Sequence, residues 1–97
     1  MATYITLATF SDQGLRNVKD TVKRADDFQK AAKQAGVRVK EFLWTQGHYD
    51  LMVIVEAPDE ASYSALLLSV ARMGNVRLQS LRAFTAAEME GILDKVI

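Results

Sequence analysis

Apolar residues recur with two different periods along the chain, and the change of period marks the predicted elements. Residues 3–10 are rich in β-branched and aromatic side chains, which favours a strand. After the turn residues 11–14, apolar positions recur at steps of three and four as far as Gly36, as on an amphipathic helix. That stripe consists of Leu15, Val18, Val22, Ala25, Phe28, Ala32 and Ala35.

The rest of the chain predicts three more strands and two more helices. Gly47 separates two strands, which indicates an antiparallel hairpin and a positive φ at this residue. Asp59 is a candidate N-cap, and Thr85 with Glu88 has the spacing of a capping box. The predicted strands cover 37–46, 48–57 and 75–84, and the predicted helices cover 59–73 and 85–96.

The predicted element order is β-α-β-β-α-β-α over a single domain of residues 1–97. The first six elements match the ferredoxin-like arrangement, an α+β fold. Right-handed crossovers place both long helices on one face of a four-stranded antiparallel sheet. The expected strand order is 4-1-3-2, with a C-terminal helix added.

One face of this sheet is left without helices, and the pattern predicts that it is apolar. In the third strand Leu51, Val53 and Val55 are assigned to the helix side. This leaves Met52 and Ile54 on the open face. The polar residues assigned to the same face are His48, Asp50 and Glu56.

In the first strand, Ile5 and Leu7 are assigned to the helix side. The open face would then receive Tyr4, Thr6, Ala8 and Phe10. Monomers rarely expose a large apolar patch, so we expect a second subunit to cover it as a homodimer or a multiple of dimers. Sheet-to-sheet pairing would give a dimeric α+β barrel. Its polar members Tyr4, Thr6, His48 and Asp50 would line a cavity between sheet and helices.

Composition narrows the function classes. The 97 residues are 49% hydrophobic and 25% charged, which is a globular balance. Lys plus Arg and Asp plus Glu both number 12, so no basic excess favours nucleic acid or an anionic membrane. Without cysteine and with one histidine, disulfides and a multi-histidine metal site within one subunit are excluded, and no metal or cofactor is indicated. Lacking a leader pattern and a long apolar run, the chain is expected to be cytoplasmic.

His48 and Asp50 are the candidate catalytic residues. They are two apart on a predicted strand and so share a face. They could form a base with its orienting carboxylate, two ligands of a metal, or a structural hydrogen-bonded pair. Tyr49 would point to the opposite face and pack under a helix.

The remaining candidates are ligand-binding residues. Hydroxyl groups on an otherwise apolar sheet face, as at Tyr4 and Thr6, can fix the orientation of a ligand or form a polar spot in the dimer interface. Trp44 lies with Phe42 on one side of a predicted edge strand, where it makes a core or subunit contact or a stacking wall. Arg82 could hold a carboxylate or form an ion pair.

The segment 45–50, Thr-Gln-Gly-His-Tyr-Asp, resembles the GYD domain family, which is named for a Gly-x-Tyr-Asp segment. His48 stands where Arg is common in that pattern. The family resembles dimeric α+β barrels in fold, and the resemblance implies no specific activity. Further similar segments are 4–7, 13–14, 53–59, 74–77 and 81–85.

These observations favour a small homo-oligomeric module that binds a small, mostly apolar molecule between sheet and helices. One alternative is a cofactor-independent oxygenase or isomerase of a small aromatic or dicarbonyl compound. His48 or Asp50 would then be the base, and Tyr4 or Arg82 would stabilise the anion. The other alternative is a structural or assembly subunit.

Overall fold

Four antiparallel strands form one sheet in the computed structural model, which describes residues 1–97. The order is β2-β3-β1-β4, which is the predicted order 4-1-3-2 read from the other edge. The expected α+β arrangement, with β1 and β3 in the centre, is therefore confirmed. The strands are β1 Ala2–Phe10, β2 Arg38–Trp44, β3 Leu51–Ala57 and β4 Val76–Ala83.

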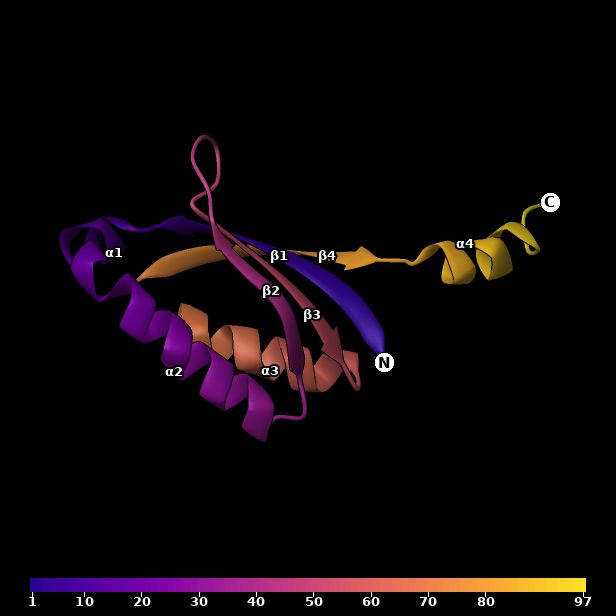
Figure 1. Ribbon diagram of the computed structural model, residues 1–97, viewed down its shortest axis with the longest axis horizontal. Coiled ribbons are helices and arrows are strands. Elements are labelled where there is room, and N and C mark those ends of the chain that lie inside the picture. The colour runs from indigo at the N-terminus through magenta and orange to yellow at the C-terminus, as the bar shows by residue number, and fades with distance from the viewer.

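The two long helices, α2 (Thr21–Gln34) and α3 (Glu60–Ala71), lie side by side on one face of the sheet (Figure 1). The last helix, α4 (Ala86–Leu93), projects beyond the end of β4 as an arm (Figure 1). No helix is both long and apolar enough to cross a membrane.

The predicted helix over 15–35 is broken near its start. Helix α1 covers Asp12–Arg16, a 3₁₀ turn η1 covers Val18–Asp20, and α2 follows directly. The break is at Asn17, whose backbone (φ −109°, ψ 28°) is not helical. The early part of the apolar stripe consequently does not reach the sheet, and Leu15 and Val22 are 56% and 60% exposed.

The predicted N-caps of α3 and α4 are confirmed. The Asp59 carboxylate accepts a hydrogen bond from the Ser62 amide at 2.7 Å. That bond lowers the pKa of Asp59. At α4 the Thr85 hydroxyl and the Glu88 carboxylate each accept from the other's backbone amide, which completes the capping box.

Hydrogen bonds join the turn after β1 to the turn before β4 at one end of the sheet. The Ser11 amide donates to the Asn75 carbonyl at 3.0 Å, and Gln13 Nε2 donates to Asn75 Oδ1 at 2.9 Å. Gly14 is buried against this turn, and a Cβ there would lie 2.0 Å from the Asn75 carbonyl oxygen. The close approach therefore requires glycine at position 14.

The faces of β1 are the reverse of those predicted. Thr6 pairs with Val53 and Leu7 with Met52. The side chains of Tyr4, Thr6 and Ala8 therefore face the helices and are buried, while Ile5 and Leu7 lie on the open face. Alternation in β1 identified two faces but not which one the helices cover, because both carry apolar side chains. The core on the helix face comprises Tyr4, Ala32, Val37, Val53, Val55, Ala57, Tyr63 and Leu66.

The open face remains apolar after this correction. Ile5 pairs with Ile54 and with Leu81, so these three side chains lie next to one another across three strands. Leu7 and Met52 continue the row on β1 and β3. The face contains more aliphatic side chains than the sequence assignment gave it, because Ile5 and Leu7 replace Tyr4 and Thr6.

Candidate functional site

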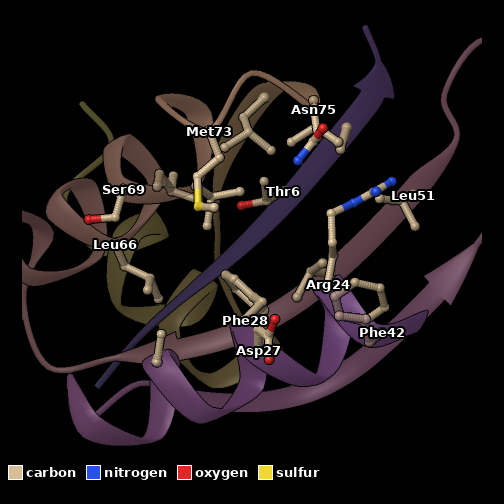
Figure 2. A pocket seen from close by; sticks show the side chains of 18 of the residues that line it. Thr6, Arg24, Asp27, Phe28, Phe42, Leu51, Leu66, Ser69, Met73 and Asn75 are labelled. Atoms are coloured by element: carbon tan, nitrogen blue, oxygen red, sulfur yellow. The ribbon is translucent and has the colours of Figure 1, made fainter. Parts of the chain in front are cut away.

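A cavity of about 340 Å³ lies between the helix face of the sheet and helices α2 and α3 (Figure 2). This is near the lower end of the size range of small-molecule pockets, about 300–1,000 Å³. Most of its lining is apolar, as in typical ligand pockets. The apolar residues include Ala8, Phe10, Ala25, Phe28, Phe42, Leu51, Val53, Leu66, Leu67, Val70 and Leu78.

Aromatic side chains form the wall next to β2. The rings of Phe28 on α2 and Phe42 on β2 are 6.1 Å apart. Phe42 in turn lies 5.1 Å from Trp44, whose Nε1 donates to the Thr21 hydroxyl at 3.0 Å. Trp44 therefore lies behind the wall rather than in it, and β2 is the edge strand that the sequence predicted.

Hydroxyl groups cross-link the sheet floor to α3. Thr6 Oγ1 lies 2.5 Å from the Tyr63 hydroxyl and 3.1 Å from Ser80 Oγ. Tyr63 is 2% exposed, and burial raises its pKa above the ordinary value of 10.0. Its ring lies 5.0 Å from that of Tyr4, whose buried hydroxyl has no hydrogen-bond partner. Thr6 thus lines the cavity as a bonded group, and Tyr4 lies beside it in the core.

Arg24 is the cationic residue in the cavity wall. Its Nη1 donates to the Asn17 carbonyl at 2.9 Å, and its Nη2 is buried without a partner. The acidic residue of the wall, Asp27, pairs instead with Lys23 at 3.2 Å. Sequence reasoning missed Arg24, although it lies four residues before Phe28 and so shares a helix face with it. A charged side chain on an amphipathic helix is normally assigned to solvent.

His48 and Asp50 do not form a pair. β3 begins at Leu51, so both residues lie in the loop 45–50 rather than on a strand. Asp50 Oδ2 accepts from the Phe10 amide at 2.8 Å, which ties the loop to β1. His48 is exposed and its ring makes an edge contact with Tyr49 at 5.1 Å. Gly47 has the predicted positive φ, 111°.

Tyr49 lies on the open face rather than under a helix as predicted. Its hydroxyl donates to Gln79 Oε1 at 3.0 Å, and Gln79 pairs with Leu7 on that face. The prediction was wrong because it extended the alternation of β3 into the loop, where the backbone no longer alternates.

Arg82 does not line the cavity and is occupied by structural contacts. Its guanidinium stacks 4.5 Å from the Phe84 ring and 5.7 Å from the Tyr4 ring. It donates to the carbonyls of Thr3 and Ala83, and it pairs with Glu88 at 3.6 Å. Arg82 therefore links α4 to the sheet. Of the six sequence-predicted site residues, Thr6 alone lines the cavity.

The family model for the GYD domain matches residues 4–93. The chain belongs to the GYD domain family. A relative of this GYD chain from Thermus thermophilus is 31% identical over 90 residues, which cover 92% of this chain and 95% of that protein. It is named glutamine synthetase and cystathionine beta-lyase binding protein.

Two solved structures share the fold of this GYD chain. FFRP-DM1 is 20% identical with a TM-score of 0.57, over 87% of this chain and all of the other. TTHA0845 from Thermus thermophilus is 22% identical with a TM-score of 0.57, over 89% of this chain and 96% of the other. At these identities the likeness concerns the fold alone.

Proposed function

We propose that this GYD protein is a small binding module that holds a compact, mostly apolar molecule in the cavity between the sheet and helices α2 and α3. The observation that carries the proposal is the cavity itself, about 340 Å³ with a largely apolar lining. Its floor is rigidified by the bonded hydroxyls of Thr6 and Tyr63, which supports a preformed site. The binding role of the Thermus thermophilus relative is consistent with a module that recognises rather than transforms.

The proposal includes self-association through the open face of the sheet. Ile5, Ile54 and Leu81 lie together there with no helix above them, and Leu81 is 43% exposed. Covering such a face removes apolar surface from water at about 25 cal/mol per Å². A homodimer or a multiple of dimers would bury it symmetrically.

Native mass spectrometry of gently purified protein tests both parts. We expect a dimer or a multiple of dimers that retains a small molecule. The Ala25→Leu variant extends a buried wall residue into the cavity and should lose the extra mass. Ala65→Leu makes the same change on an exposed part of α3 and should keep it. Wild-type protein without a bound molecule that also fails to bind small apolar compounds added at millimolar concentration would contradict the cavity function.

Two matched variants test self-association through the open face. Leu81→Lys places a charge on the open face and should yield monomers. Leu68→Lys changes a 69% exposed leucine on α3 and should leave the mass unchanged. A wild-type monomer at micromolar concentration would remove self-association from the proposal and leave the cavity part standing.

Binding of a partner enzyme is the second candidate function. It is favoured by the name of the Thermus thermophilus relative together with the apolar open face of this chain. Purified glutamine synthetase mixed with this protein should then give a complex in size-exclusion chromatography with light scattering. Leu81→Lys should abolish that complex while Leu68→Lys preserves it. Separate elution of both wild-type proteins would count against this candidate.

A further inference from the structure

We propose that the ligand of the cavity carries a carboxylate that pairs with Arg24. This inference rests on the proposed function and names the chemical class of the molecule. The ligand would be a compact monocarboxylate whose body is an aryl or branched alkyl group. Arg24 is the one cation of the cavity wall, and no carboxylate of the protein pairs with it.

The guanidinium of Arg24 has a hydrogen-bond partner at Nη1 and none at Nη2. Its Nη1 donates to the Asn17 carbonyl at 2.9 Å, at the break between α1 and the 3₁₀ turn. Its Nη2 is buried without a partner. An enclosed charged donor without an acceptor costs free energy, so a small shift of the guanidinium that brings it against an acceptor supplied by a ligand would be favourable.

The other polar side chains of the wall already have partners within the protein. Thr6 bonds Tyr63, and Asp27 accepts from Lys23. Thr21 accepts from Trp44, Ser69 donates to the Ala65 carbonyl and Asn75 accepts from Gln13. Arg24 therefore carries the charge in the wall that no group of the protein neutralises, and the ligand would supply the missing partner.

The charges around the cavity favour an anion of single charge. Arg24 and Asp27 are the charged residues of the wall, and Lys23 offsets the charge of Asp27. No carboxylate of the chain forms a salt bridge with Arg24. A planar carboxylate matches the guanidinium edge in geometry and charge. A phosphate dianion would bring a second charge into a largely apolar cavity with no second cation to offset it.

The surroundings of Arg24 define the body of the ligand. Figure 2 shows its side chain reaching toward Leu51, with Phe28 and Phe42 close by. The rings of Phe28 and Phe42 are 6.1 Å apart and offer edges and faces to a ligand ring. A volume of about 340 Å³ limits that body to a small one.

Isothermal titration calorimetry with matched acid and amide probes tests the anchor. The pairs are 3-phenylpropanoate with 3-phenylpropanamide, and 4-methylpentanoate with its amide. Of the two acids, the one with the higher affinity should bind wild-type protein about 10- to 100-fold more tightly than its amide. The Arg24→Met variant keeps the side-chain length without the charge, and it should lose that preference while binding the amide unchanged. Lys30→Met removes an exposed cation of the same helix and should retain the wild-type preference.

The outcomes separate the two proposals. Equal affinities for acid and amide in wild-type protein, or an acid preference that survives in Arg24→Met, would overturn the anchor and leave the cavity function intact. The cavity function and the anchor are both overturned if none of the four probes binds and, in native mass spectrometry, Ala25→Leu retains the same bound mass as wild-type protein. Circular dichroism of each variant shows that the comparison is made on folded protein.

Discussion

The hydroxyl oxygens of Thr6 and Tyr63 lie 2.5 Å apart, which joins the central strand β1 to α3 under the cavity. These residues are 57 positions apart in the sequence. Both side chains are almost fully buried, and the Tyr63 hydroxyl depends on Thr6 for its partner, whereas Thr6 also contacts Ser80. The contact therefore contributes to stability and fixes the floor of the cavity.

Removing either hydroxyl of the Thr6–Tyr63 pair should lower the free energy of unfolding, and loss of the Thr6 hydroxyl should lower it more. Tyr63→Phe should lower the free energy of unfolding by about 1 kcal/mol, because Thr6 keeps its contact with Ser80. Thr6→Val should cost about 1–3 kcal/mol, since it leaves the Tyr63 hydroxyl buried and unpaired. In urea denaturation the double variant should be less destabilised than the sum of the two single variants. Strictly additive losses would contradict the contact.

The raised pKa of Tyr63 predicts a stability loss in alkaline solution. Burial holds the phenol protonated in the folded protein at pH values where the unfolded chain ionises. The folded state then binds more protons, so this contribution is fully present below pH 10.0 and is lost as the pH rises through the folded pKa. Denaturation midpoints from pH 8 to 11 should therefore fall more steeply for wild type than for Tyr63→Phe. Parallel curves would show that burial does not perturb this phenol.

Gly14 should be the glycine least tolerant of a side chain. Gly14→Ala places a Cβ 2.0 Å from the Asn75 carbonyl oxygen, so the turns that join β1 and β4 must separate. We expect a loss of about 2–4 kcal/mol in the free energy of unfolding. Gly91→Ala is the control, since nothing lies within 4 Å of its Cβ in α4, and it should cost nothing or gain up to about 1 kcal/mol. Similar losses for both variants would contradict this packing.

Most of the fold was predictable because its signals are local. Asp59 caps α3, Thr85 and Glu88 open α4, and Gly47 turns the hairpin, each within four residues of the element that it bounds. The faces of β1 were not predictable in this way. The hydroxyl of Thr6 is satisfied by Tyr63 and Ser80, which are 57 and 74 residues away.

The candidate site was harder to predict than the fold for the same reason. Thr6 was identified, although on the wrong face, because a hydroxyl in an apolar strand stands out. Arg24 was missed because its buried end exists only when α2 is placed against β2 and β3. His48 and Asp50 drew attention by their spacing, but β3 starts later than expected and their contacts diverge.

Substitution of Asp50 should destabilise the protein, whereas substitution of His48 should not. Asp50→Ala removes the acceptor of the Phe10 amide and should lower the free energy of unfolding by about 1–2 kcal/mol. His48→Ala changes an exposed side chain and should stay within about 0.5 kcal/mol of wild type. Neither change should affect binding of a carboxylate probe. Loss of probe binding in the stable His48→Ala variant would indicate a site at the 45–50 loop instead.

The most direct test of the cavity as a binding site is a ¹H–¹⁵N correlation NMR titration with 3-phenylpropanoate. We expect chemical-shift changes grouped around Ala25, Phe28, Phe42 and Leu66, which line the cavity on α2, β2 and α3. Ala25→Leu should remove those changes while Ala65→Leu preserves them. Changes confined to the open face or to residues 45–50, or no changes at millimolar probe, would show that the cavity is not the binding site.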